Sequence, residues 1–432
     1  MKFKNIQIKE GWQQFSSINI DFHPKLTVLT GANGAGKTTL LRFLAKHFGY
    51  TYTSLLTPGI EKDSSGWLYT AKKIFRSFFS DSKTTEPVQI GSISYSSGKT
   101  SAIRAPIQAK KADYQPTIDS IEKVKGFFLP SHRPEFKYER VKTLSLEPRS
   151  WEEDAFKSIH NQIISLSQGT AHLLDRNNRN KPVSFKMKEL LVGLGIFGAG
   201  GGSLQPDYRA RELFEGFQEI LRKVLPQDIG FEKIEIRDRS EIVLITNSGN
   251  FLLDAVSGGI ASIFELAWLL YMYDEQGLGD FTVVLDEPEN HLHPSMQRTL
   301  LPSFVDAFPQ VQFIIATHSP FMVGSVRDSN TYALKFNTEP KSNDLIKEVA
   351  AVKLDFSKTA SRAEEILNDV LGVDVTIPIW AETKLEEIVS ELAEEELSPE
   401  LAIKLRKKIT ENGLSHLMPQ ALNKLNQEAK ND

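Results

Sequence analysis

The chain has 432 residues, 40% of them hydrophobic and 25% charged, which is typical of a globular protein and excludes a disordered or collagen-like chain. Lysine and arginine number 51 against 55 aspartate and glutamate residues, so the net charge of -4 gives no global basic surface for nucleic acid. Cysteine is absent, which excludes disulfides, cysteine-ligated metals and thiol nucleophiles. No apolar run reaches about 18 residues and no signal peptide is evident, so we expect a cytoplasmic protein without a membrane partner.

The first 50 residues predict strands, then a glycine-rich loop, then a helix. Apolar residues alternate or nearly alternate between residues 3 and 22, and residues 26–29 form a short apolar run that ends at the loop. Leucine and phenylalanine at helical spacing then predict a helix over residues 38–47.

The middle of the chain is mixed. Residues 88–95 and 102–107 are strand-like, residues 68–79 are helix-like, and residues 124–129 have the pattern of a buried strand. Residues 150–225 then look mainly helical.

A glycine-rich segment interrupts this helical part at residues 193–203. Gly193, Gly195 and Gly198 match the G-x-G-x-x-G pattern of dinucleotide-binding loops. We reject that function because no clear strand precedes the segment and no acidic residue ends a strand about 20 positions later. A flexible loop inside a helical insertion is the preferred interpretation.

Apolar and polar residues alternate again over residues 234–253, which predicts a hairpin. A long apolar helix is expected after Gly259. The apolar runs at residues 281–285 and 313–316 are typical of central strands buried on both faces. The last 75 or so residues are charged and helical in pattern.

The glycine-rich loop matches G-x-x-x-x-G-K-[ST] without a mismatch and lies between a strand and a helix, as a phosphate-binding loop requires. Backbone N–H groups and the helix N-terminus would hold the phosphates, Lys37 would neutralise their charge, and Thr38 would ligate Mg²⁺. The segment comprises Gly31, Ala32, Asn33, Gly34, Ala35, Gly36, Lys37, Thr38 and Thr39.

Asp286 and Glu287 follow a buried apolar run and should therefore lie at the carboxyl end of a strand, where ligands bind in open α/β sheets. Asp286 can hold the Mg²⁺ shell, and Glu287 is placed to orient or deprotonate the water that attacks the γ-phosphate. His318 follows another buried strand, so its ring could reach the same crevice. The pair His291 and His293 could suggest a metal site, but we favour a structural loop because no third ligand is evident nearby.

The segments GANGAGKTT, AVSGG, VVLDEPENHLHP and ATHSP, in that order, resemble the ATP-binding-cassette (ABC) ATPases. DEPENHLHP is similar to the SMC, RecF and OLD-like branch rather than to transporter cassettes. The resemblance implies an α/β fold of the ABC-type P-loop NTPases, with a mixed central sheet, an antiparallel β-lobe, a helical insertion and a helical C-terminal tail. The cofactors it implies are ATP and Mg²⁺.

The same resemblance implies roles for single residues. The loop at residues 31–39 would be Walker A, Asp286 and Glu287 would be Walker B, and His318 would be the switch histidine. Ser257, Gly258 and Gly259 would be the signature, which in such ATPases meets the γ-phosphate bound by the other head of a dimer. The segment VSGGI lacks the glutamine that often ends this motif, and the Q-loop glutamine cannot be placed.

We expect four parts along the chain: an ATPase lobe over 1–150, a helical insertion over 151–230, a second ATPase lobe over 231–335, and a C-terminal helical region over 336–432. Lys37 and Asp286 are 286 - 37 = 249 residues apart, too close for long SMC coiled-coil arms. WAETKLEEIV has a glutamate but no D-x-D follows, so a Toprim nuclease domain is not expected.

The first functional hypothesis is an ATPase that forms a homodimer or higher homo-oligomer and controls a separate effector protein, a nuclease. ATPases resembling this chain do so in bacterial antiphage systems such as Septu and PARIS. The alternative is a RecF-like DNA repair ATPase, with DNA or RNA bound by basic residues such as Lys110, Lys111, Arg176, Arg179 and Lys181, although solvated loops are the preferred interpretation of each. A transporter cassette is third.

Overall fold

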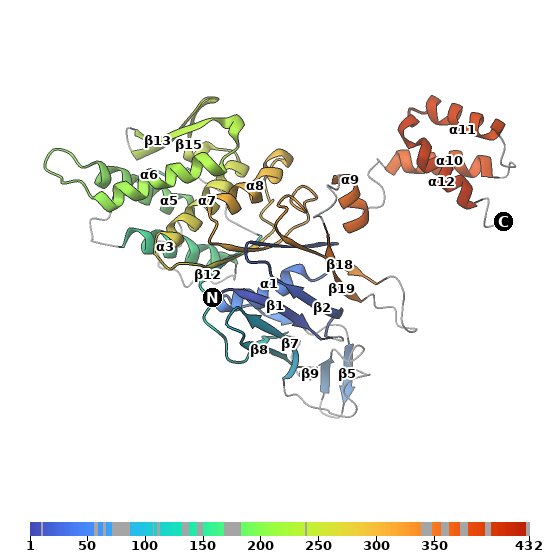
Figure 1. The fold of residues 1–432 in the computed structure, drawn as a ribbon, viewed down its shortest axis with the longest axis horizontal. Helices are drawn as coiled ribbons and strands as arrows, with labels where there is room; N and C mark the ends of the chain where they lie inside the picture. The colour runs from blue at the N-terminus through green and yellow to red at the C-terminus, as the bar shows by residue number, and fades with distance from the viewer. Residues whose placement is uncertain are drawn as a thin grey trace. The chain divides into compact units, whose positions relative to one another are not determined.

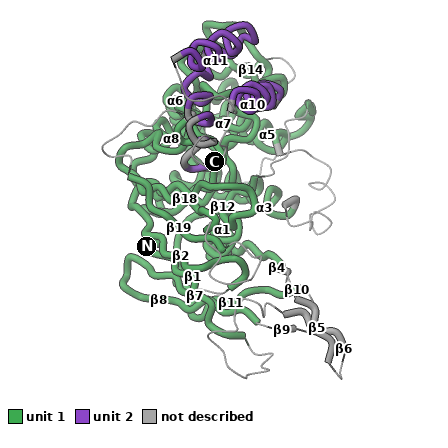
Figure 2. Tube along the Cα trace, turned by 90° about the vertical axis from the view of Figure 1, so that its right-hand side faces the viewer, with its two compact units in different colours: residues 1–366 green, residues 367–432 purple. Residues whose placement is uncertain are grey.

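A computed structural model describes most of the chain and divides it into two compact units, Met1–Ile366 and Leu367–Asp432 (Figure 2). The finer division into four parts stays a prediction. The described residues are 1–9, 12–55, 59–63, 66–70, 87–106, 108–109, 113–131, 138–144, 150–167, 183–237, 240–337, 348–355, 363–371, 379–393 and 399–428.

The first unit contains strands from both halves of the sequence, some of which Figure 1 labels. They are β1 (Phe3–Ile8), β2 (Phe15–Asp21), β3 (Leu26–Gly31), β4 (Ser54–Leu55), β5 (Gly59–Asp63), β6 (Gly66–Thr70), β7 (Val88–Tyr95), β8 (Thr100–Ala105), β9 (Gln108–Ala109), β10 (Asp113–Tyr114), β11 (Thr117–Ile118), β12 (Gly126–Leu129), β13 (Phe231–Arg237), β14 (Glu241–Thr246), β15 (Gly249–Leu252), β16 (Thr282–Asp286), β17 (Gln312–Ala316), β18 (Asn330–Phe336) and β19 (Val349–Leu354).

Its helices include several of 14 to 17 residues and some single turns. They are α1 (Lys37–Ala45), η1 (Lys46–Phe48), α3 (Trp151–Ser167), α5 (Val183–Ala199), α6 (Tyr208–Val224), η3 (Gln227–Ile229), η5 (Leu253–Ala255), α7 (Gly258–Asp274), α8 (Pro294–Ala307) and α9 (Ala363–Glu365). The π-helical turn η6 (Ile366–Val370) spans the boundary between the two units.

Eleven strands of the described part form one mixed sheet, in the order β11-β8-β7-β1-β2-β19-β18-β3-β17-β16-β12. Strands β18, β3, β17, β16 and β12 are parallel to their neighbours in that run. Strands β11, β8, β7, β1 and β2 pair antiparallel. This arrangement confirms the expected mixed sheet with an antiparallel lobe.

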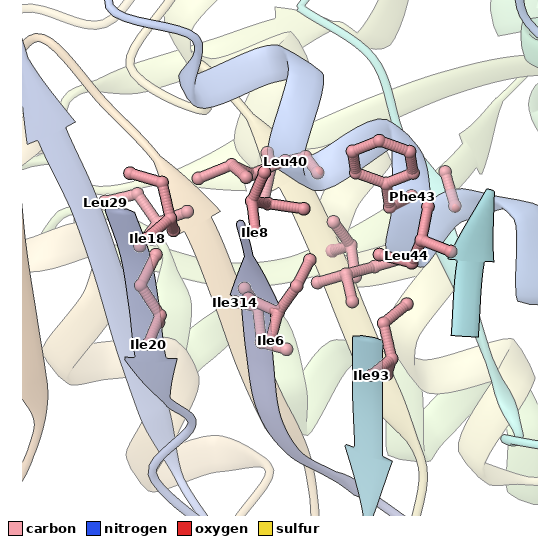
Figure 3. Close-up of a cluster of buried hydrophobic side chains, with 14 of the residues drawn as sticks. Ile6, Ile8, Ile18, Ile20, Leu29, Leu40, Phe43, Leu44, Ile93 and Ile314 are labelled. Atoms are coloured by element: carbon pink, nitrogen blue, oxygen red, sulfur yellow. The ribbon is translucent and has the colours of Figure 1, made fainter. Parts of the chain in front are cut away.

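Helix α1 connects the two halves of this sheet through one apolar cluster (Figure 3). Leu40, Phe43 and Leu44 lie at helical spacing and are almost fully buried, as the sequence predicts. Their side chains meet those of Ile6, Ile8, Ile18, Ile20 and Ile93 from the antiparallel lobe and of Leu29 and Ile314 from the parallel strands. The packing fixes the start of α1 beside the ends of β3 and β17.

Helices α3, α5, α6 and α7 gather beside the small sheet β13-β14-β15 (Figure 1). The expected interruption of the helical part is wrong for most of its length, because α5 continues through Gly193, Gly195 and Gly198 to Ala199. A Cβ at Gly198 would lie 2.8 Å from backbone atoms of Arg211 in α6, and one at Gly195 would lie 2.2 Å from Ile236. The glycines therefore permit close packing of the helix, and only residues 200–203 form a loop.

Two other sequence expectations differ from the structure. Leu68 lies in strand β6 rather than in a helix, and residues 71–79 lie outside the described residues. Strand β19 falls within the region 336–432 that we expect to be helical, and it pairs with β18 and β2 in the main sheet. The helical pattern begins after it, at Ala363.

The second unit contains α10 (Ile379–Ala393), α11 (Pro399–Glu411), η7 (Ser415–Leu417) and α12 (Met418–Glu428). These helices share an apolar core of their own that includes Leu385, Leu405 and Leu425. In α11, Ile403 is 68% exposed, whereas Leu405 and Ile409 are buried.

Candidate active site

Three neighbouring parallel strands deliver the predicted site residues to one edge of the sheet. Strand β17 lies between β3 and β16, with Ala316 opposite Leu29 and Asp286. The glycine-rich loop follows β3, Glu287 follows β16, and His318 comes two residues after β17. Since carboxyl ends of parallel strands share one edge, the fold brings these segments together.

The glycine-rich loop has the backbone that its sequence predicts. Gly31, Gly34 and Gly36 have positive φ values of 131°, 77° and 93°. A Cβ at Gly31 would lie 2.3 Å from the carbonyl oxygen of Leu334, so only glycine fits beside β18. The Gln14 side chain donates a hydrogen bond to the Gly34 carbonyl, which ties the β1–β2 connection to the loop.

Lys37 is buried at the first position of α1, and its ammonium donates to the carbonyl oxygens of Gly31 at 2.8 Å and Ala32 at 3.0 Å. Burial lowers the pKa of Lys37 to about 8, although the nearby carboxylates Glu287 and Asp286 raise it. An ammonium held by two carbonyl oxygens can exchange them for phosphate oxygens, which form stronger charge-assisted hydrogen bonds.

Thr38 and Asp286 lie beside each other at this edge of the sheet. The Thr38 hydroxyl donates to Oδ1 of Asp286 at 3.1 Å. Burial raises the pKa of Asp286 to about 6, and the hydrogen bond from Thr38 opposes that shift. A hydroxyl and a carboxylate beside a phosphate site are oxygen ligands that suit Mg²⁺, so the residues present fit this ion.

Glu287 has a left-handed backbone, with φ of 48°, which is rare for residues other than glycine. Its N–H donates to the Ala316 carbonyl at 2.9 Å, and this bond stabilises the strained conformation. Its Oε1 lies 3.8 Å from Nε2 of His318, and Nδ2 of Asn290 donates to Oε2 at 3.2 Å. Burial and the charge of Lys37 lower the pKa of His318, so its ring is neutral near pH 7.

The structure adds Glu289 and Asn290, to which the sequence assigned no role. Oε1 of Glu289 accepts a hydrogen bond from the backbone N–H of His318 at 2.6 Å, and burial raises its pKa. Both residues belong to the acidic segment after β16, so the DEPEN motif was the available signal. The sequence did not show that the loop after β17, which contains His318, packs against this acidic segment.

The signature segment begins helix α7. Ser257 is its N-cap, and its hydroxyl accepts from the N–H of Ile260 at 3.5 Å. Gly258 lies against the side chain of His291 and Gly259 lies against its backbone, where a Cβ at Gly259 would lie 3.0 Å from the His291 carbonyl oxygen. Ser257 is therefore part of a helix N-terminus, which favours anions.

His293 has a structural role as the N-cap of helix α8, because its Nδ1 accepts a hydrogen bond from the N–H of Ser295. Among the described residues no group of three or more histidines and acidic residues is arranged to hold a metal ion. The basic residues proposed for nucleic acid, Lys110, Lys111, Arg176, Arg179 and Lys181, lie outside the described residues.

A phosphate loop, paired strand-end acids, a strand-end histidine and a mixed sheet with an antiparallel lobe define an ABC-type ATPase head. Residues 26–324 match the family described as "AAA domain, putative AbiEii toxin, Type IV TA system", and the chain belongs to that family.

Two curated relatives match shorter segments. The Septu protein PtuA of Bacillus thuringiensis is 27% identical over 187 residues, which are 40% of this chain and 46% of that protein. The Retron Vc95 probable ATPase of Vibrio cholerae serotype O1 biovar El Tor is 31% identical over 127 residues, 27% of this chain and 25% of that protein. The chain thus spans less than half the length of these relatives.

Two solved structures match the chain at low similarity. The SMC head domain from Thermotoga maritima gives a TM-score of 0.37 at 11% identity, covering 82% of this chain and 100% of that one. An SmcHead bound to the C-winged helix domain of ScpA gives a TM-score of 0.39 at 14% identity, covering 83% of this chain and 100% of that one.

In the described part of the chain no helix is long and apolar enough to cross a membrane.

Proposed function

We propose that this chain is an ATPase whose two heads close around ATP and thereby control a separate effector protein, a nuclease, in bacterial antiphage defence. The observation that carries the ATPase part is the convergence of Lys37, the Thr38–Asp286 pair and the Glu287–His318 pair at one sheet edge. The defence role is supported by the relatives named as a Septu protein and a retron ATPase.

In this proposal each side chain has one task. Lys37 and the loop N–H groups hold the β- and γ-phosphates, and Thr38 and Asp286 would hold Mg²⁺, which supplies charge neutralisation at the phosphates. Glu287 accepts a proton from, or orients, the attacking water. Neutral His318, whose Nε2 lies 3.8 Å from Oε1 of Glu287, would donate a hydrogen bond to the γ-phosphate.

Dimerisation is supported by the place of Ser257. It opens an anion-favouring helix, yet its hydrogen-bond partner is the N–H of Ile260 in the same helix. A second copy that brings the ATP bound to its own phosphate-binding loop against Ser257 would give this N-terminus an anionic ligand, the γ-phosphate.

A first experiment measures dimer formation. Glu287→Gln should bind ATP and Mg²⁺ without rapid turnover, so light scattering after gel filtration should show a dimer with ATP and a smaller species without it. Lys37→Ala is the control and should stay unchanged by ATP. If Glu287→Gln with bound ATP stays monomeric, the sandwich part of the proposal is wrong.

A second experiment tests the effector. Cells that express the chain with its neighbouring genes should resist phage, and resistance should be lost on deleting either the ATPase or a neighbouring nuclease gene. Resistance that persists with the ATPase alone would contradict control of a separate effector.

A further inference from the structure

Lys188 of helix α5 carries a fully buried ammonium group, with 0% of its side chain exposed. Its Nζ donates to Oδ2 of Asp254 at 2.6 Å and to Oε2 of Glu241 at 2.8 Å. The carbonyl oxygen of Glu139 accepts a third, longer hydrogen bond at 3.3 Å. One cation thus neutralises two carboxylates that stand 53 and 66 residues away in the chain.

Tyr138 completes the group. Its ring lies under the Lys188 ammonium, 5.1 Å from Nζ to the ring centroid, and its hydroxyl donates to Oε1 of Glu241 at 3.0 Å. We call Tyr138, Lys188, Glu241 and Asp254 the Lys188 cluster. Burial by itself would lower the pKa of Lys188, but the hydrogen bonds that its ammonium donates to Asp254 and Glu241 outweigh burial and raise the pKa, so the ammonium stays charged.

The cluster joins three elements. Lys188 comes from α5, Glu241 begins β14, and Asp254 is the middle residue of η5. The short helix η5 ends at Ala255, and Ser257 caps α7 two residues later. The neighbour of Asp254, Leu253, is 0% exposed, so η5 is held by apolar packing on one side and by the ion pair on the other.

Such a cluster contributes little to the stability of the protein, but it fixes the relative positions of the elements that it joins. Desolvating two carboxylates and an ammonium offsets most of their attraction, and apolar residues of similar volume often stabilise a protein equally well. The short hydrogen bonds, in contrast, fix the distance between α5 and η5 closely. Oδ1 of Asp254 is buried without a hydrogen-bond partner among the described residues, so Asp254 is held mainly through Lys188.

We propose that Lys188 is a positioning residue for the signature segment: by holding Asp254 it sets the position of η5 and of Ser257, and it thereby couples helix α5 to hydrolysis of the ATP bound by the other protomer. This inference rests on the proposed sandwich dimer. A ligand or partner that displaces α5 would change turnover without touching the nucleotide.

The first test compares two substitutions on the same helix. Lys188→Met keeps an unbranched apolar side chain, one atom shorter than lysine, but removes the ammonium. Lys186→Met is the matched control, because Lys186 pairs at 2.6 Å with Glu189 of α5 itself and does not reach η5. Lys188→Met should keep the ATP affinity of the head within about twofold and lower kcat about tenfold or more, since the signature acts only in the closed dimer.

Lys186→Met should leave both quantities at the wild-type level. Wild-type kcat in folded Lys188→Met would overturn the proposal, and so would an equal loss of kcat in the control.

A second variant separates position from stability, because Lys188→Met leaves two buried carboxylates without a cation. The triple variant Lys188→Met, Glu241→Gln and Asp254→Asn removes all three charges at similar side-chain volume. We expect its melting temperature to return toward the wild-type value while kcat stays low. If kcat recovers together with the melting temperature, the cluster is structural only and the proposal is wrong.

Ser257→Arg, measured in parallel, distinguishes failure of the sandwich dimer from failure of the role proposed for Lys188. If Ser257→Arg hydrolyses ATP at the wild-type rate, the sandwich dimer itself fails. If Ser257→Arg is inactive but Lys188→Met and the triple variant are active, only the role of Lys188 fails.

Discussion

At the scale of single residues, the site combines a strained backbone with buried charge. Glu287 keeps a left-handed φ of 48° and lies beside His318, whose N–H is held by Glu289. Backbone strain of this kind is maintained where surrounding contacts over-determine it. The sequence predicted Lys37, Thr38, Asp286, Glu287 and His318 as parts of one site, because motif spacing places each at the end of a strand or the start of a helix.

The pairings of Glu289 and of Lys188 could not be predicted in the same way. Glu289 meets His318, 29 residues away, and Lys188 meets Asp254, 66 residues away. Such contacts depend on how loops and helices from different parts of the chain pack, and no local spacing carries that information.

Glu287→Gln should keep ATP bound but lower its hydrolysis by on the order of 100-fold, because general-base and water-positioning contributions are of that size. The amide retains the volume and the hydrogen bond from Asn290 but accepts a proton poorly. Calorimetric titration gives the affinity, and phosphate release gives the rate. Unchanged turnover would exclude Glu287 as the base.

At the scale of elements, α5 shows why the sequence pattern predicted a loop where the structure has a helix. Glycines lower helix propensity by about 1 kcal/mol each, so a run containing Gly193, Gly195 and Gly198 predicts a loop. In the structure close contacts with α6 and β13 stabilise the helix in spite of that cost. Tertiary packing therefore outweighed local preference. The strands β3, β16 and β17 were predicted correctly because their apolar runs agree with their full burial.

Gly198→Ala should lower the free energy of unfolding of the first unit by about 1 to 3 kcal/mol, the usual cost of overpacking. The new Cβ would lie 2.8 Å from the Cα and N atoms of Arg211, and backbone atoms cannot move aside easily. Gly193→Ala is the matched control, since its Cβ would meet the Trp151 ring at 3.2 Å. Urea unfolding measures both, and an equal or larger loss in Gly193→Ala would contradict this account.

Helix α3 supplies a prediction about pH. His160 is stacked on Phe156 with 5.0 Å between ring centroids, and burial lowers its pKa to about 4. Between pH 6.5 and 4 the unfolded chain binds a proton at this ring and the folded chain does not, so stability falls as the pH falls through that window.

His160→Gln should reduce the loss of unfolding free energy between pH 7.5 and pH 5 by about 2 kcal/mol, from 1.36 kcal/mol per pH unit over the affected range. The measurement is urea unfolding of both proteins at the two pH values. His47, whose pKa burial also lowers to about 4, contributes a similar slope to both and does not affect the difference. Identical pH dependence in the two proteins would exclude His160 as a source.

At the scale of the whole molecule, the second unit has its own apolar core, and every residue of the candidate site lies in the first unit. A chain of residues 1–371 should therefore bind ATP with wild-type affinity, while partner-dependent function is lost. Calorimetry on the soluble truncated chain checks the affinity. A truncated chain that is insoluble or binds no nucleotide would show that the second unit is needed for the ATPase head.

The central claim is that ATP is hydrolysed between two heads, with Ser257 of one head against the nucleotide of the other. Ser257→Arg should leave ATP binding by the isolated head intact but abolish hydrolysis. The long side chain would fill the space in which the N-terminus of α7 must approach the γ-phosphate.

The most direct test is therefore the ATP turnover of Ser257→Arg at protein concentrations where the wild type is dimeric. A sandwich dimer predicts turnover at background level together with wild-type ATP affinity, whereas hydrolysis at the wild-type rate would contradict the sandwich dimer.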